Sequence, residues 1–129
     1  MPGELQAVVR DLVVALDRKD FVAIEQMLSD DTQGVDETSR RWLRTRQQIS
    51  DHLRQLEPAI QNIHTELRDV HEIVWGDTGL VTCWLEQDYV LNDQPQHISA
   101  PTTIGLHRAG DRWQIVLVHS VPMPEGPSG

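Results

Sequence analysis

The sequence is short of cysteine, of basic residues and of long apolar runs. A single cysteine, Cys83, among 129 residues excludes an internal disulfide and a cysteine-rich zinc site. Only 11 Lys and Arg residues stand against 20 Asp and Glu, a formal net charge of -9. With no basic cluster, nucleic acid is not an expected partner. No run approaches the ~18–20 apolar residues of a membrane span and no secretory leader is found, so we expect a cytoplasmic protein with no membrane partner.

Sequence motifs that hold common cofactors are absent as well. The six histidines show neither His-x-x-x-His nor His-x-His spacing, and there is no Gly-rich phosphate loop and no Gly-x-Ser-x-Gly elbow. We therefore expect no metal site and no cofactor. Cys83 lies in the middle of an apolar extended segment, where the default is a buried, unreactive thiol.

The first third of the chain has the spacing of amphipathic helices. One apolar stripe recurs at intervals of three and four residues, and its members are Leu5, Val8, Val9, Leu12, Val13 and Leu16. Asp20 is a suitable N-cap for a second, short helix that carries Phe21 and Ile24 on one face. Residues 29–31, Ser-Asp-Asp, are expected to end this second helix.

A polar stretch follows, and then a third helix. Residues 32–44 contain few large apolar side chains and are interpreted as a loop with a short strand. Thr45 and Gln48 fit a capping box, which predicts a helix beginning there. Pro58 closes this helix because the residue before a proline avoids the helical conformation.

The second half of the chain is predicted to be extended. Segments 62–75, 79–91, 96–108 and 112–121 are separated by turn signals rich in Gly, Asn and Asp. Such short connections predict an antiparallel meander. Helices followed by a long sheet indicate an α+β domain over residues 1–121 with the helices on one face of the sheet, and residues 122–129 form a flexible tail.

The last strand is apolar on both faces. Strict alternation places Trp113, Ile115 and Leu117 on one face and Val116 and Val118 on the other. Three helices cover only one face of a sheet, so the other face is predicted to form a homodimer.

The order of these elements resembles the nuclear-transport-factor-2-like superfamily, in its SnoaL-like and ketosteroid-isomerase-like branch. The resemblance spans about residues 5–121, and its motifs are the segments 16–20, 27–31, 76–82 and 106–113 with His119-Ser120. It implies a cone-shaped, curved antiparallel sheet around a cavity whose mouth is closed by about three N-terminal helices. It also implies a wide choice of function, because the family includes isomerases, cyclases, dehydratases, epoxide hydrolases and non-catalytic association domains.

The comparison with the steroid isomerases places three residues. Their carboxylate base corresponds to Asp36, their oxyanion-binding Asp to Thr103, and their helix-one Tyr to Leu12. One hydrogen-bond donor is thus weakened and the other lost, and the loss of such a donor typically costs 10²–10³ in rate. Steroid-type isomerisation is disfavoured.

Three residues remain candidates for acid–base catalysis. Asp36 is either a general base at the cavity mouth or part of a solvated acidic loop with Glu37. Asp88 shares a strand face with Trp84 and Glu86, and the alternation leaves open whether that face or the one with Cys83 points inward. His107 lies on the face of Thr103, which the isomerase comparison turns inward, and an imidazole there can relay protons near neutral pH.

The aromatic residues suggest a ligand pocket. Four tryptophans stand beside one Tyr and one Phe, and their rings either line one cavity or fill the core. The ligand-binding candidates are Leu12, Trp42, Trp84, Thr103 and His119, although His119 also fits a core or interface position. Two hypotheses result. The first is a protein that binds a small apolar or polycyclic molecule, as a cofactor-independent acid–base enzyme of isomerase, cyclase or dehydratase type. The second is a dimeric association module with a vestigial pocket.

Overall fold

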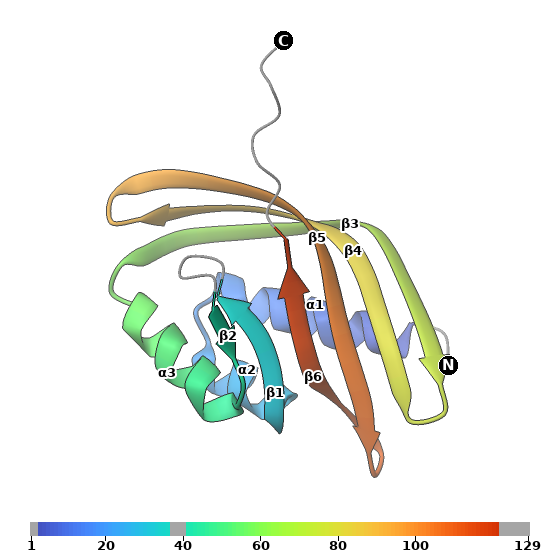
Figure 1. Ribbon diagram of the computed structural model, residues 1–129. Coiled ribbons are helices and arrows are strands. Elements are labelled where there is room, and N and C mark those ends of the chain that lie inside the picture. The colour runs from blue at the N-terminus through green and yellow to red at the C-terminus, as the bar shows by residue number, and fades with distance from the viewer. Residues whose placement is uncertain (1–2, 37–40, 122–129) are drawn as a thin grey trace.

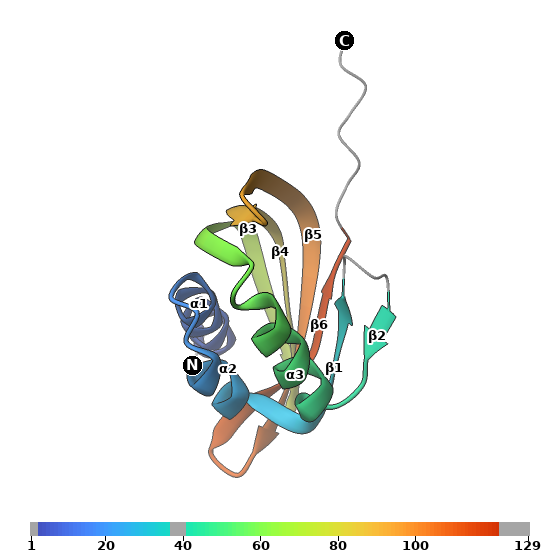
Figure 2. The same ribbon diagram turned by 90° about the vertical axis from the view of Figure 1, so that its left-hand side faces the viewer.

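The computed structural model describes residues 3–36 and 41–121, in which three helices pack on one face of a six-stranded sheet (Figures 1 and 2). The helices are α1 (Glu4–Asp17), α2 (Phe21–Met27) and α3 (Arg46–Leu56). The strands are β1 (Leu28–Asp36), β2 (Arg41–Leu43), β3 (Ile60–Trp75), β4 (Thr78–Leu91), β5 (Gln94–Ala109) and β6 (Arg112–Ser120). The α+β class and the curved sheet with helices on one side are confirmed. Among the described residues no helix is both long and apolar enough to cross a membrane.

The predicted helix signals are found in the structure. The buried face of α1 carries Leu5, Val9 and Leu12 of the predicted stripe, together with Ala15. The Asp20 side chain caps α2 by accepting a hydrogen bond from the backbone N–H of Ala23. The Thr45 hydroxyl accepts from the N–H of Gln48 at 3.1 Å.

The sheet order is β2-β1-β6-β5-β4-β3, and β3 to β6 form the predicted antiparallel meander. Its turns use left-handed backbone at Gly76, Asn92, Asp93 and Gly110, residue types that tolerate positive φ. The sheet as a whole is mixed, because β1 runs parallel to β6.

The segment after α2 differs from the prediction. The chain enters β1 at Leu28, so residues 29–31 lie in a strand, and within the predicted loop region residues 32–36 and 41–43 lie in two strands. Strand β1 is polar, and a hydrogen bond to the neighbouring strand β6 stabilises it. The fully buried Thr32 donates its hydroxyl hydrogen to the backbone carbonyl of Ile115. A polar strand held by such a long-range bond shows no apolar alternation, which is why the sequence did not reveal it.

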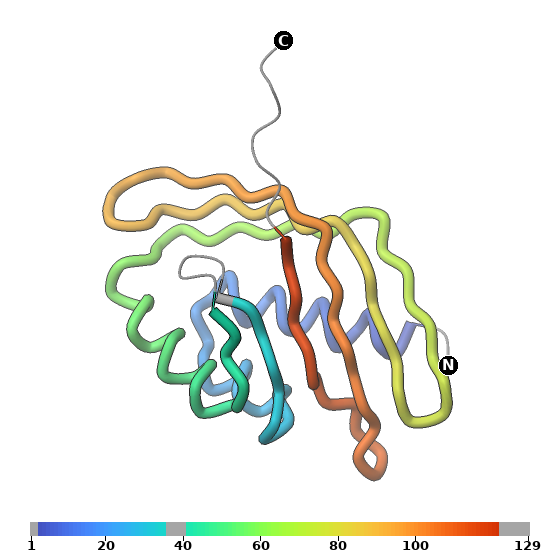
Figure 3. Tube along the Cα trace, in the orientation of Figure 1, coloured from blue at the N-terminus to red at the C-terminus, as the bar shows by residue number. Residues whose placement is uncertain are grey.

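The long strands β3, β4 and β5 bend along their length and curve over the helices (Figure 3). The pairing of β3 with β4 is irregular between Gln61 and His64 and again between Arg68 and His71. Asn62 and Asp69, inside these two interruptions, both have φ of 55°. Bulges of this kind bend a strand and increase its twist, so they give the sheet the hollow inner face that the helices close.

A bulge in β6 overturns the predicted faces of that strand. Gly105 pairs with Leu117 but Leu106 pairs with Ile115, so Val116 is an extra residue without a partner in β5. Alternation therefore restarts after Val116: Ile115 and Val118 both pack on the core. A Cβ on Gly105 would meet Leu117 Cβ at 3.2 Å and Val116 Cγ2 at 3.5 Å, which places both side chains over the outer face.

Candidate functional site

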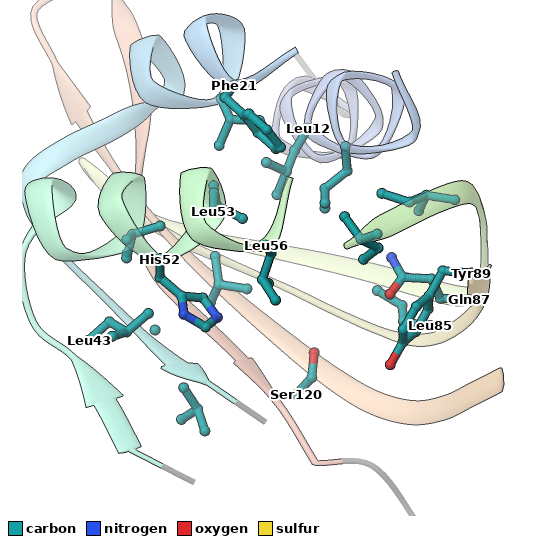
Figure 4. A pocket seen from close by; sticks show the side chains of 18 of the residues that line it. Leu12, Phe21, Leu43, His52, Leu53, Leu56, Leu85, Gln87, Tyr89 and Ser120 are labelled. Atoms are coloured by element: carbon teal, nitrogen blue, oxygen red, sulfur yellow. The ribbon is translucent and has the colours of Figure 1, made fainter. Parts of the chain in front are cut away.

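An apolar cavity of about 260 Å³ lies between the helices and the inner face of the sheet (Figure 4). Every helix and strand contributes to its wall. Leu12 and Phe21 approach from α1 and α2, Leu53 and Leu56 from α3, and Leu85 from β4 (Figure 4). Most of the wall is aliphatic, which is typical of sites for small apolar molecules.

The structure decides which face of β4 points inward. Val81 and Cys83 are 0% and 6% exposed, and Leu85, Gln87 and Tyr89 on the same face line the cavity. The alternate residues, among them Trp84 and Asp88, therefore lie on the outer face. The predicted burial of Cys83 is confirmed, and this burial raises the pKa of its thiol.

Four lining residues carry side-chain polar atoms: His52, Gln87, Tyr89 and Ser120. His52 reaches the cavity from α3, whereas Gln87 and Tyr89 reach it from the opposite side (Figure 4). The Ser120 hydroxyl is hydrogen-bonded to the Thr102 hydroxyl at 2.8 Å. Of these groups, His52 carries the only imidazole ring of the described wall.

The described wall of the cavity contains no Asp or Glu. Asp36 ends β1, but its side chain lies outside the described residues, so its role as a base stays a prediction. The described residues also contain no group of three His, Cys, Asp or Glu side chains able to hold a metal ion.

Asp88 and His107 lie away from the cavity. The Asp88 side chain is 64% exposed and pairs with His97 on the outer face. His107 is exposed as well, because its neighbour Leu106 points into the core and Thr103, Gly105 and His107 share the opposite face. The expectation that the Thr103 and His107 face turns inward is therefore wrong for this chain.

Of the predicted ligand-binding residues, one lies in the cavity wall and four lie outside it. Leu12 lies in the cavity wall. Trp84 and Thr103 are on the outer face, where the Arg68 guanidinium lies 5.3 Å from the Trp84 ring. Trp42 is 44% exposed and contacts the His119 ring in a tilted arrangement, with 5.7 Å between ring centroids. These residues fall outside the cavity because each follows the outward half of its strand's alternation.

The tryptophans do not line the cavity, although the sequence left that interpretation open. Trp75 is 55% exposed at the end of β3, and Trp113 donates its indole N–H to Glu4 Oε2 at 3.1 Å. The aromatic rings in the wall are those of the only Phe and the only Tyr in the sequence, Phe21 and Tyr89.

The sequence analysis missed the four polar lining residues, although the sequence carries a signal for three of them. His52 stands three residues after Ile49 and four before Leu56, on the apolar stripe of α3. Gln87 and Tyr89 share the strand face of Cys83 and Leu85. Ser120 carries no such signal, because the bulge at Val116 shifts the alternation before it.

A polar cluster on the outer face surrounds His97. Its Nδ1 lies 2.8 Å from Asp88 Oδ1 and its Nε2 lies 3.2 Å from Glu86 Oε2. The hydrogen bond to Asp88, followed by the negative charges of Asp88 and Glu86, raises the pKa of His97. Arg68 and Ser99 also donate to Glu86, and these bonds lower the pKa of the Glu86 carboxyl.

We expect Asp88→Asn to lower the pKa of His97 towards its ordinary value of ~6.5. Because the folded-state pKa of His97 lies above the unfolded one, its ion pairs stabilise the fold below pH ~6.5 and the effect disappears as the pH rises through the raised value. Titration of the His97 ring protons by NMR measures both values, with His97→Gln to assign the resonance. A wild-type pKa of His97 at or below ~6.5 would contradict the charge pairing.

Comparison with known families and structures agrees with this fold. The family model described as a SnoaL-like domain matches residues 5–124. A candidate dehydratase of the NTF2-like family from Streptomyces avermitilis superposes with a TM-score of 0.83 at 19% identity, covering 94% of this chain and 95% of that one. No curated protein matches the sequence significantly.

Two further solved structures have different descriptions. A candidate aromatic ring hydroxylase from Novosphingobium aromaticivorans gives a TM-score of 0.85 at 14% identity, with 93% and 87% of the two chains covered. A candidate Ca/calmodulin-dependent kinase II association domain from Exiguobacterium sibiricum gives 0.81 at 20% identity, with 97% and 93% covered. Identities this low show that the fold is shared and carry no information on activity.

Proposed function

The chain belongs to the SnoaL-like domain family, and from this premise we propose that it binds an apolar small molecule in the cavity beneath its helices. The observation that carries the proposal is the wall of that cavity, which is apolar except for the polar side chains of His52, Gln87, Tyr89 and Ser120. Its volume of about 260 Å³ is close to the lower limit of ~300 Å³ for ordinary ligand sites. Compact bicyclic or tricyclic compounds match this size.

An acid–base reaction without a cofactor is the catalytic form of this proposal. In the described wall the proton-exchanging group would be His52, since no carboxylate lines the cavity there. Steroid-type isomerisation stays disfavoured, because Leu12 offers no hydrogen bond and Thr103 lies on the other face of the sheet. Isomerase, cyclase and dehydratase chemistry on an apolar compound remain the reaction types proposed.

We expect Ile98→Trp to abolish binding of any compound that wild-type protein binds in the cavity, with at least a tenfold loss of affinity. Ile98 lines the cavity opposite Gln87 in the β4–β5 register, so an indole there occupies ligand space. A thermal-shift screen of terpenoid, polyketide and steroid compounds, followed by calorimetric titration, measures the effect.

The matched control is Val90→Trp, which adds the same side chain at the same end of the sheet. Val90 stands between Tyr89 and Leu91, both in the cavity wall, and so faces outward. The control should retain binding. If no compound stabilises the wild type, or if Ile98→Trp binds as well as the control, the proposal of a ligand cavity fails.

A second candidate function is a dimeric association module that uses the outer face of the sheet. The bulge at Val116 favours it, since it turns two adjacent apolar residues, Val116 and Leu117, to that face. The Exiguobacterium sibiricum structure of the same fold is described as an association domain. On this basis we propose a homodimer through the outer face. It is compatible with ligand binding, because the cavity lies on the inner face.

A further inference from the structure

Three polar side chains form a hydrogen-bonded row from the end of α1 to the cavity wall. Asp17, the last residue of α1, accepts two bonds from Thr65 in β3: Oδ1 from the hydroxyl at 2.7 Å and Oδ2 from the backbone N–H at 3.1 Å. Gln87 in β4 donates from Nε2 to the Thr65 hydroxyl oxygen at 3.0 Å. Thr65 is only 7% exposed, so the row is shielded at its centre.

Counting hydrogens in this row fixes the orientation of the Gln87 amide. A carboxylate accepts hydrogen bonds and donates none, so the single hydroxyl hydrogen of Thr65 goes to Asp17. The Thr65 oxygen can then only accept from Gln87, and only the NH₂ end of that amide can donate. The carbonyl oxygen of Gln87, Oε1, must therefore turn away from Thr65.

The amide of Gln87 lies at the cavity (Figure 4). Within the described part of the chain, no hydrogen bond reaches its Oε1. The surrounding wall is apolar, with Leu85 on the same face of β4 and Ile98 opposite in the register. Among the described residues no side-chain oxygen is both buried and unpaired, so Oε1 is accessible from the cavity. A ligand hydroxyl can donate to it there, whereas an apolar group placed against it forfeits that bond.

The position of Asp17 is a second indication that this row of hydrogen bonds has a role beyond the stability of α1. A carboxylate at the carboxyl end of a helix is disfavoured by the helix dipole, yet the last residue of α1 is an Asp. Its two bonds from Thr65 compensate, and they set the direction of every hydrogen bond from there to the cavity.

We propose that Gln87 determines the specificity of the cavity by accepting a hydrogen bond from a hydroxyl group on an otherwise apolar ligand, an alcohol or phenol in preference to the matching ketone. Asp17 and Thr65 are positioning residues that hold the Gln87 acceptor towards the ligand. The inference rests on the proposed binding function and names the ligand class for it.

Asp17→Asn should reverse the preference. The backbone N–H of Thr65 still requires an oxygen at position 17, so the new NH₂ group faces the Thr65 hydroxyl and donates to it. The Thr65 hydroxyl hydrogen is then free to donate to Gln87, whose carbonyl turns to Thr65 and whose NH₂ group turns to the cavity. The cavity becomes a donor and favours the ketone.

The test compares borneol, camphor and bornane, which share one bicyclic carbon skeleton and carry a hydroxyl, a carbonyl or neither. We expect wild-type protein to bind borneol roughly five- to tenfold more tightly than camphor, the strength of one neutral hydrogen bond. Asp17→Asn should invert the order, and Gln87→Leu should bind the two alike. Calorimetric titration measures the affinities, and the circular dichroism of each variant checks its fold.

The outcomes separate this inference from the function on which it rests. Equal binding of borneol and camphor by the wild type, or an unchanged order in a folded Asp17→Asn protein, overturns the role of Gln87 and leaves the cavity intact. If Asp17→Asn does not fold, Thr65→Val removes the hydroxyl and should narrow the borneol preference to less than twofold; an undiminished preference overturns the inference. Absence of binding for all three compounds removes the binding function and this inference together.

Discussion

Leu106→Ala is expected to lower the free energy of unfolding by about 3 kcal/mol, within the ~2–5 kcal/mol found for buried leucines. Leu106 is fully buried, and its partners across the sheet are Gly79 on β4 and Ile115 on β6. A Cβ on Gly79 would clash with Leu5 Cδ1 of α1. Leu5 occupies that space beside Leu106, so removal of the Leu106 side chain leaves a void between α1 and the sheet.

Urea unfolding followed by circular dichroism measures this effect. The matched control is Val14→Ala, which removes apolar atoms from a residue of α1 that is 46% exposed, and its effect should stay within about 0.5 kcal/mol. A loss below ~1 kcal/mol for Leu106→Ala would show that the helix layer relaxes into the void and that the packing of α1 on the sheet is loose.

The helices and the meander could be predicted because their signals are local. The stripe from Leu5 to Leu16 repeats at helical spacing, and Asp20 and Thr45 cap the helices that follow them. The hairpin turns follow from residues that accept a left-handed backbone, such as Gly76 and Gly110. Each of these signals lies within a few residues of the structure that it specifies.

The features that the sequence did not reveal depend on distant partners. β1 is polar and is held by β6 through Thr32, more than eighty residues away. The bulge at Val116 fits because Gly105 on the neighbouring strand β5 has no side chain, which leaves room for the side chains of Val116 and Leu117. A single extra residue exchanges the two faces of a strand, so alternation counted along β6 alone gave the wrong partners for Leu117 and Val118.

Dependence on distant partners also explains why most residues of the candidate site could not be predicted. Both faces of β4 and β5 carry apolar residues, so the sequence alone did not show which face packs on the core. The isomerase comparison favoured the face of Thr103 and His107. In the structure the helix layer covers the other face, with Val81 and Ile104 buried beneath it. The polar lining residues Gln87 and Tyr89 follow directly once that face is known.

The second large expected effect concerns the proposed dimer interface on the outer face of the sheet. In a twofold-symmetric dimer one residue is used twice, so a single substitution changes the interface at two places. Leu117 points to the outer face beside Val116, over the bare backbone of Gly105. If this patch forms the centre of the proposed dimer, a carboxylate at residue 117 would be buried without a partner in both protomers.

Leu117→Asp is therefore expected to weaken the dimer by about 4 kcal/mol, two sites at ~2 kcal/mol each, or roughly 10³-fold in the dissociation constant. Sedimentation velocity at micromolar concentration should show a dimer for the wild type and a monomer for the variant. Val22→Asp, which adds the same charge at an apolar residue of α2 that is 58% exposed, should remain dimeric. Because Leu117 is not part of the cavity wall, the monomeric variant should still bind the ligands of the wild type. A wild-type protein that sediments as a monomer would show that the outer face needs no partner, and Val116 and Leu117 would then be only the exposed side of a bulge.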